Sequence, residues 1–383
     1  MEEWTAKLRS SVEACPLLGP PSISMLEVLV GYLGVVALLG VVLPGPSIAG
    51  AALEDKSRLT YKCNGLASLV VLIAGLGVGI RTGHILPTVV AENGGQLCST
   101  TLAFCLVMSV FVYLKGCLSQ SKTASLRSHV TGNILHDWWF GVQLNPDFLG
   151  LDLKFFWIRT GMLGWFLINL SVAAKQFQNQ GSLSLSMALY QAFSAIYVLD
   201  YFWHEEAMTS TWDIIAEKFG FMLIFGDVVF IPFTFSIQAS AYGWWLLSHS
   251  VKISKIAAAL NLCIFLFGFA IFRGANKQKH KFKQDSKVVI WGQTAKVIGG
   301  RLLASGYWGV ARHCNYLGDI LVAFSFSLPC GMSSPVPYFY PAYLFTLLIW
   351  RERRDEARCC EKYREVWQEY CKAVPWRIFP GIY

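Results

Sequence analysis

Long apolar runs separated by short polar segments dominate the chain between residues 25 and 350. A helix that crosses a bilayer needs roughly 20 predominantly apolar residues, and most of the runs approach that length with their flanking residues. The pattern therefore predicts membrane-spanning helices. The predicted spans are Met25–Val42, Leu66–Ile80, Leu97–Leu114, Thr160–Ala174, Leu183–Trp203, Phe219–Ala241, Ile256–Phe272, Ile320–Leu328 and Pro335–Trp350.

Two of these runs leave their structure open. Phe219–Ala241 is interrupted by Asp227 and Pro232, so it forms either one span or the first arm of a tight hairpin that continues through Trp245. Ile320–Leu328 is short for a full crossing and is compatible with a partly re-entrant segment. Periodicity does not decide between these alternatives.

Acidic residues lie at the end of the fifth predicted span. A carboxylate inside a span costs roughly 2.5 to 3.5 kcal/mol, which makes Asp200 a functional candidate. We interpret His204, Glu205 and Glu206 as the solvated end of the helix. The HEE sequence lacks the HExxH spacing that places two imidazoles on one helical face, so no zinc site is predicted.

Composition agrees with a polytopic membrane protein. The chain is 54% hydrophobic and 15% charged, and its mean hydropathy is +0.46, whereas soluble domains have about 25% charged residues. The net charge of +8 gathers in short segments beside apolar runs, which indicates cytosolic loops rather than nucleic-acid binding.

The 11 cysteines include no CxxC pair, and several lie in apolar runs, so we expect buried thiols rather than disulfides. The N-terminus lacks a basic n-region and a cleavage site, so we expect a retained first span.

The segment RLLASGYWGVARHCNYLGD, residues 301–319, breaks the apolar pattern. Its glycines permit close backbone approach, and its aromatic and polar side chains offer flat faces, donors and charge. A membrane-interface loop has a similar composition. Composition alone favours neither a ligand site nor an interface loop.

The order of residues in this segment resembles the signature LLxSGWWGxxRHxNYxGD of the sterol reductase family, which includes C14 and C7 sterol reductases and the membrane half of the lamin B receptor. Tyr307 departs from it. Three further segments are similar to the family patterns GNxxYDFxxGxELNP, FRxxNxxKxxFR and HRxxRDxxxCxxKYGxxWxxYCxxVPxRIxPxIY, and the matches cover roughly residues 132–383. The departures in these segments are His136, Gln143, Lys283, Trp350 and Arg364.

The resemblance implies an all-α polytopic membrane protein of about ten transmembrane helices, because the family folds the sixth run as a hairpin. Both termini and the basic loop after span eight would then face the cytosol. It implies one transmembrane domain over residues 1–383, with N-terminal helices and the sterol side in residues 1–250. Residues 251–383 would hold the cofactor and the catalytic region, in a pocket on the cytosolic side. No GxGxxG follows a strand, so no Rossmann domain is expected.

The resemblance also implies NADPH as cofactor and a sterol substrate that enters from the bilayer, with membrane lipids as surroundings and no nucleic-acid partner. Asp355 and Tyr197 would deliver the proton for reduction of a double bond. The implied location is the endoplasmic reticulum membrane, which is continuous with the nuclear envelope. The expected cofactor contacts are Lys279, Lys283, Leu303, Trp308, Arg312, Asn315, Tyr316, Asp319, Arg351 and Tyr370.

Within the family, the segments HEEAMTSTWDIIAEKF, GANKQKH and LLIWRERRDE resemble the C14 branch and its plant members most. This resemblance implies reduction of the C14=C15 double bond of 8,14-diene sterols during sterol biosynthesis. C7 reduction is the alternative within the family. A non-catalytic sterol-binding receptor would need a long basic N-terminal domain, and only about two dozen residues precede the first span. A transporter would predict internal repeats, and none is found. The oligomeric state is not indicated.

Overall fold

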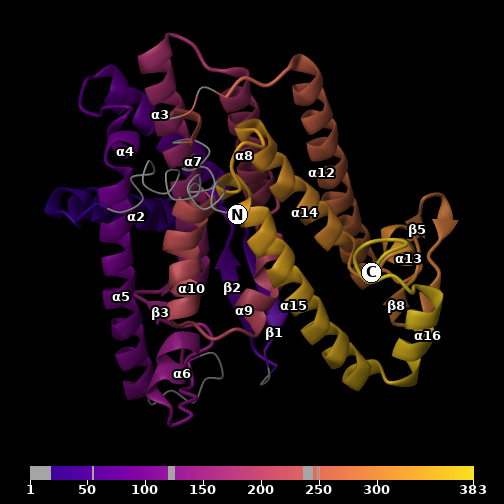
Figure 1. Cartoon of the computed structure of the whole chain (residues 1–383). Helices are drawn as coiled ribbons and strands as arrows, with labels where there is room; N and C mark the ends of the chain where they lie inside the picture. Colours follow the sequence, from indigo (N-terminus) through magenta and orange to yellow (C-terminus); the bar gives the residue numbers. More distant parts are fainter. Residues whose placement is uncertain (1–18, 54–55, 120–125, 236–244, 248, 250) are drawn as a thin grey trace, which may run out of the picture. The chain divides into compact units, whose positions relative to one another are not determined.

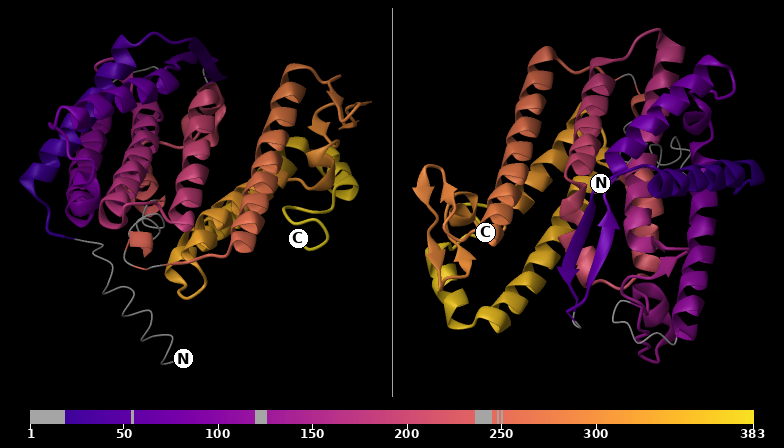
Figure 2. Two further views of the ribbon diagram at one scale, coloured as in Figure 1. Left: turned by 90° about the horizontal axis from the view of Figure 1, so that it is seen from above. Right: turned by 180° about the vertical axis from the view of Figure 1, so that it is seen from behind.

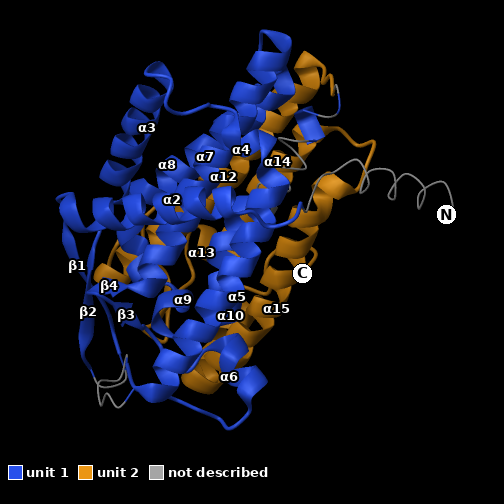
Figure 3. Ribbon diagram, turned by 90° about the vertical axis from the view of Figure 1, so that its left-hand side faces the viewer, with its two compact units in different colours: residues 1–250 blue, residues 251–383 orange. Residues whose placement is uncertain are grey.

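The computed structural model describes residues 19–53, 56–119, 126–235, 245–247, 249 and 251–383. The described residues are mostly helical. They belong to two compact units, residues 1–250 and residues 251–383, which Figure 3 shows in separate colours.

Unit 1 is a set of helices, several of which run side by side, with small antiparallel strand pairs (Figures 1 and 2). Its helices are α2 (Ile23–Val42), α3 (Gly65–Arg81), α4 (Val89–Glu92), α5 (Gly94–Leu118), α6 (Ile134–Phe140), α7 (Leu153–Gln180), α8 (Leu185–Trp203), α9 (Trp212–Ile215) and α10 (Phe221–Phe225), with a 3-10 helix η1 (Glu205–Ser210) and a π-helix η2 (Gly226–Phe235). Its strand pairs are β1 (Ser47–Ala52) with β2 (Arg58–Lys62) and β3 (Asp147–Phe148) with β4 (Leu151–Asp152).

Unit 2 combines long helices with two short β-hairpins (Figure 1). Its helices are α12 (Lys255–Gln284), α13 (Tyr307–Val310), α14 (Cys314–Ser327), α15 (Phe339–Tyr363) and α16 (Glu365–Ala373), with short 3-10 helices η3 (Leu328–Cys330) and η4 (Val336–Tyr338). The hairpins pair β5 (Val289–Ile290) with β6 (Gln293–Thr294) and β7 (Val297–Ile298) with β8 (Leu302–Leu303). The predicted helical membrane class is confirmed, but the sequence did not predict the strand pairs.

Four helices of the described part of the chain are long and apolar enough to cross a membrane, namely α2, α5, α7 and α12. Shorter apolar helices occupy Gly65–Arg81, Phe221–Phe233 and Cys314–Cys330. The total of about ten spans stays a prediction. The second arm of the expected hairpin falls largely on residues 236–244, which lie outside the described residues.

Side-chain caps explain where several long helices begin. Asp152 accepts a hydrogen bond from the Phe155 backbone N–H at 2.9 Å, so α7 starts before the apolar run. Ser184 and Ser254 cap α8 and α12 in the same way. An N-cap oxygen satisfies one of the backbone donors that a helix start leaves unpaired. Short polar residues therefore determine where these helices start, which the hydrophobic pattern alone does not show.

Two predictions about the charged segments are wrong. The lysine-rich segment after Phe272 was expected to be a loop, but α12 continues through it to Gln284, because the segment lacks glycine and proline after Gly274. Glu205 was expected at a solvated helix end, but it is buried and pairs with Arg159, with 2.9 Å between Oε1 and Nε. Its second oxygen accepts from the Gly65 N–H at 2.8 Å. His204 and Glu206 are exposed, as expected.

Glycines allow α12 and α14 to pack closely within unit 2. A Cβ on Gly318 would lie 2.5 Å from the backbone nitrogen of Phe272, and one on Gly268 would lie 3.0 Å from the Gly318 carbonyl oxygen. Small residues at such crossings let helix backbones approach, which is typical of membrane helix pairs. This contact fixes α14, whose first turn contains the NY portion of the RHCNY segment, against α12.

Candidate functional site

The expected cofactor residues all lie in unit 2, on elements that are adjacent in sequence or packed together. Lys279 and Lys283 lie one turn apart on α12, and Leu303 lies on β8. The remaining expected contacts lie on α13, α14, α15, α16 and the segment before α14. Among all these residues Lys279 and Lys283 are exposed, and the others are buried or partly buried.

Trp308 is the centre of the first group of contacts. Its indole Nε1 donates to the Ala275 carbonyl oxygen on α12 at 2.8 Å. The Lys279 ammonium lies 4.4 Å from the centroid of the Trp308 ring, which is cation–π geometry. The Tyr370 hydroxyl on α16 donates to the Trp308 carbonyl oxygen at 3.0 Å. Thus α12, α13 and α16 meet at one aromatic residue, and a cation lies against it.

The β-hairpins complete the apolar side of this group. Leu303, Ile290, Ala275 and Trp308 belong to one buried cluster. The chain enters α13 through Gly306, whose φ is +59°, and a Cβ there would lie 2.4 Å from the Gln278 side-chain oxygen. Glycine is needed at this turn because an L side chain would be strained and would clash. The glycine of the motif therefore has a local structural role.

A second group joins α14 to α15. The Tyr316 hydroxyl donates to Oδ2 of Asp355 at 3.1 Å. Arg351 lies one turn before Asp355 on α15, as expected from their spacing. Asn315 and Asp319 lie one turn apart on α14. The structure therefore brings together a carboxyl and a phenol that were predicted separately, one as an acid and one as a cofactor contact.

Arg312 is held by protein partners. Its guanidinium NH1 donates to the carbonyl oxygens of Val374 and Pro375 at 2.8 and 3.1 Å. Its NH2 group lies 3.2 Å from Glu356, and its backbone N–H donates to the Trp376 carbonyl oxygen at 2.9 Å. The guanidinium therefore ties the segment before α14 to α15 and to the C-terminal segment.

Glu352 and Glu356 form an acidic pair on α15 that the sequence analysis did not single out. Glu352 is fully buried, and its Oε2 accepts from the Tyr383 hydroxyl at 3.1 Å and from Arg377 NH1 at 3.4 Å. Burial raises the pKa of Glu352. Burial acts in the same direction on Glu356, but the positive charges of Arg312 and Arg377 outweigh it and lower the pKa of Glu356. The i,i+4 spacing was visible in the sequence, but their arginine partners were not.

His313 is the other residue of this region that the predictions omitted. Its backbone N–H donates to the Arg377 carbonyl oxygen at 2.7 Å, and its ring stacks on Tyr316 with centroids 5.0 Å apart. Burial, together with the positive charge of Lys279, lowers the pKa of His313 to about 3. The imidazole is therefore neutral at physiological pH.

Three buried polar atoms around the RHCNY segment have no hydrogen-bond partner among the described residues. They are Nε of Arg312, Nε2 of His313 and Oδ1 of Asn315. A buried polar atom without a partner carries a desolvation cost that a bound molecule can relieve. These atoms, with Lys279 over the face of Trp308, fit a ligand that has both anionic groups and flat rings, such as a nicotinamide dinucleotide.

Tyr197 lies in unit 1, on α8, and is partly buried. Its ring packs against Trp165 of α7, with centroids 5.8 Å apart. Asp355 belongs to unit 2, so the pairing of Tyr197 with Asp355 stays a prediction.

The fold and this group of side chains define a helical membrane protein with a cationic and aromatic cluster near its C-terminus. A family model described as the Ergosterol biosynthesis ERG4/ERG24 family matches residues 1–383. The chain belongs to this family, which confirms the resemblance found in the sequence.

Individual relatives support this membership. A Delta(14)-sterol reductase of Arabidopsis thaliana is 58% identical over 363 residues, which cover 95% of this chain and 97% of the relative. A Delta(14)-sterol reductase of Methylotuvimicrobium alcaliphilum is 42% identical over 352 residues, covering 91% of this chain and 80% of the relative. The Delta(14)-sterol reductase LBR of Gallus gallus is 36% identical over 338 residues, covering 87% of this chain and 52% of the relative.

Proposed function

We propose that this protein is a Delta(14)-sterol reductase of sterol biosynthesis that reduces the C14=C15 double bond of 8,14-diene sterols with NADPH. The observation that carries the proposal is the 58% identity, over 95% of the chain, to a relative with that name. The site supports it by offering an acid, Asp355, next to residues that fit a nicotinamide dinucleotide. The membrane-length helices are in keeping with a sterol substrate drawn from the bilayer and with our assignment to the endoplasmic reticulum membrane.

An isolated alkene accepts hydride poorly, so the protein must first deliver a proton. In our mechanism the acid pair Asp355 and Tyr197 gives a proton to C15, and positive charge develops at C14. When bound, NADPH supplies the hydride that C14 accepts. The hydrogen bond from Tyr316 holds the Asp355 carboxyl in place. A carboxyl that must donate a proton needs an environment that keeps it protonated until the substrate is in position.

Residues of unit 2 would hold the cofactor. Lys279 and Lys283 would contact its phosphates, and Trp308 and Leu303 its rings. Asn315, Tyr316, Asp319, Arg351 and Tyr370 would complete the pocket, with Arg312 as the residue that braces its wall. Charge-assisted contacts to the extra phosphate would select NADPH over NADH. Equal turnover rates with the two cofactors would contradict this part of the proposal.

The substitution Asp355→Asn tests the proton donor. Asparagine keeps an oxygen that can accept from Tyr316, so the fold is expected to persist while the acid is lost. We expect turnover of an 8,14-diene sterol to fall by at least roughly a hundredfold, as for loss of a general acid. Glu361→Gln, an exposed acid-to-amide change on the same helix, is the matched control and should retain activity. Substantial turnover by Asp355→Asn at unchanged NADPH binding would end the assignment of Asp355.

A further inference from the structure

A buried chain of hydrogen bonds joins α7 to α8 in unit 1. The indole Nε1 of Trp165 donates to the Tyr190 hydroxyl oxygen at 3.3 Å. The Tyr190 hydroxyl in turn donates to Oδ1 of Asn169 at 2.9 Å. The exposed fractions are 1% for Trp165, 0% for Tyr190 and 2% for Asn169, so this series of hydrogen bonds is buried.

Helical spacing places these three hydrogen-bonded residues next to Tyr197. Trp165 and Asn169 lie one turn apart on α7, and Tyr190 and Tyr197 lie seven residues apart on one face of α8. Trp165 contacts both tyrosines, because its N–H bonds to Tyr190 while its ring packs edge-on against the Tyr197 ring. Tyr197 is only partly buried, whereas the residues behind it are fully buried.

The direction of the hydrogen bonds determines how the indole is oriented. An indole N–H can only donate and an amide oxygen can only accept, so Tyr190 must accept from Trp165 and donate to Asn169. A second bond, from the Gln191 amide to the Asn169 carbonyl oxygen at 2.8 Å, fastens the same turn of α7 to α8. Rotation of the Trp165 ring would break its buried hydrogen bond to the Tyr190 hydroxyl, and loss of a buried hydrogen bond is costly away from water.

We infer that Trp165, Tyr190 and Asn169 are positioning residues that hold the ring of Tyr197 in the orientation needed for proton delivery. This inference rests on the proposed function, in which Tyr197 belongs to the acid pair. A displacement of about 1 Å at a reacting group can lower a rate roughly a hundredfold. Loss of the Tyr190 hydroxyl removes the hydrogen bond that orients the indole of Trp165.

The test compares Tyr190→Phe with Tyr32→Phe. Tyr32 is a matched control because its hydroxyl also bonds to α7, at the Thr160 carbonyl oxygen 2.6 Å away, and it is not a member of the Trp165–Tyr190–Asn169 series of hydrogen bonds. For Tyr190→Phe we expect kcat to fall roughly 10- to 100-fold while the KM for NADPH is unchanged. The solvent deuterium isotope effect on kcat should rise because proton delivery becomes slower. Tyr32→Phe should show neither change.

Two results would overturn the inference. One is a kcat of Tyr190→Phe within twofold of the unsubstituted protein. The other is a fall in kcat that Tyr32→Phe matches and that leaves the isotope effect unchanged, as expected for a structural role alone. Trp165→Phe, which removes the same bond from the other side, gives the same comparison if Tyr190→Phe does not fold. Tyr197→Phe separates the two proposals, because full activity in that variant refutes the acid pair itself.

Discussion

Replacement of Arg312 by lysine tests whether its guanidinium braces the C-terminal segment against α15. In the structure one guanidinium nitrogen serves the carbonyl oxygens of Val374 and Pro375, and another faces Glu356. Arg312 is buried, so water does not replace these bonds. A lysine ammonium is a single point donor and keeps only one side of this arrangement.

The size of the effect follows from the bonds that are lost. Each buried acceptor left without a partner costs about 1 to 3 kcal/mol. With either the two carbonyl oxygens or the Glu356 carboxylate unpaired, we expect Arg312→Lys to lower the free energy of unfolding by about 2 to 4 kcal/mol. The C-terminal segment from Val374 onward should loosen first, because Arg312 is one of its attachments to α15.

Unfolding in mixed detergent micelles, followed by circular dichroism, measures the stability. Limited trypsin cleavage at Lys372 and Arg377 reports on the C-terminal segment. Arg354→Lys is the control, because Arg354 is exposed and lies over the Trp350 ring at 4.5 Å. A loss of less than about 0.5 kcal/mol for Arg312→Lys, within the range of ordinary surface substitutions, with unchanged cleavage, would refute the bracing role.

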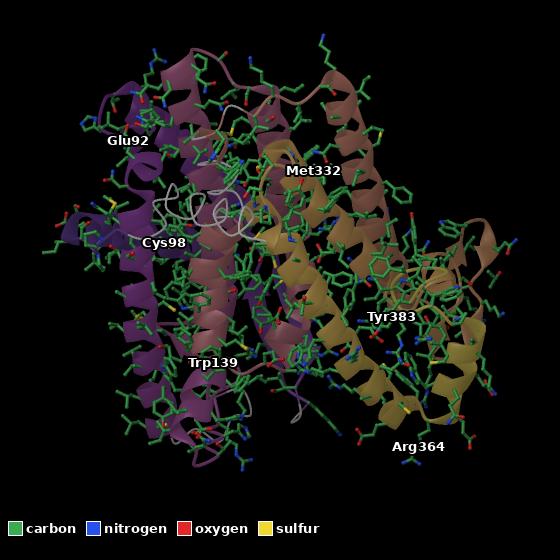
Figure 4. The ribbon with its side chains drawn as sticks, in the orientation of Figure 1. Glu92, Cys98, Trp139, Met332, Arg364 and Tyr383 are labelled. Atoms are coloured by element: carbon green, nitrogen blue, oxygen red, sulfur yellow. The ribbon has the colours of Figure 1, made fainter. Side chains whose placement is uncertain are left out.

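Three further predictions concern stability. Arg364, at the turn between α15 and α16 (Figure 4), has φ +49° and ψ −117°, so Arg364→Gly should raise the free energy of unfolding by about 1 kcal/mol in denaturant titrations; a loss would contradict the strain. His313 stays neutral in the folded protein, whereas in the unfolded chain its imidazole takes up a proton below the ordinary pKa of about 6.5. The free energy of unfolding should therefore fall as the pH drops, by about 2 kcal/mol at pH 5. His313→Gln should remove this contribution to the pH dependence of stability. Gly318→Ala should cost about 1 to 3 kcal/mol because the added Cβ meets the Phe272 backbone, and an unchanged melting temperature would argue against the close crossing.

The helical framework was predictable because apolar runs of bilayer length carry a strong signal. Leu97–Leu114 lies inside α5, and Ile256–Phe272 lies inside α12. The β1–β2 pair was not predicted, because SIAGAA contains small residues without a clear alternation of apolar and polar positions. The end of α12 was predicted too early, because its lysine-rich part is charged and was interpreted as a loop although its residues favour a helix.

Partners distant in sequence explain most of what the site predictions lacked. Glu205 follows a hydrophobic helix in the sequence and is flanked by exposed residues. Only the fold shows that its side chain is buried and forms an ion pair with Arg159. The RHCNY motif identified Arg312, but its bonds to Val374 and Pro375 depend on how the C-terminal segment folds back. By contrast, the glycine of the family pattern at position 364 is now explained, since this turn requires a positive φ.

The central claim is tested most directly on membranes from cells that express the chain, supplied with NADPH and, in separate reactions, an 8,14-diene sterol and a 5,7-diene sterol. Mass spectrometry follows the products, and membranes that carry the Asp355→Asn variant provide the background rate. The account predicts loss of the 14-ene alone, with little loss in the variant membranes. Loss of the 7-ene instead, or turnover of neither sterol by folded protein, would contradict it.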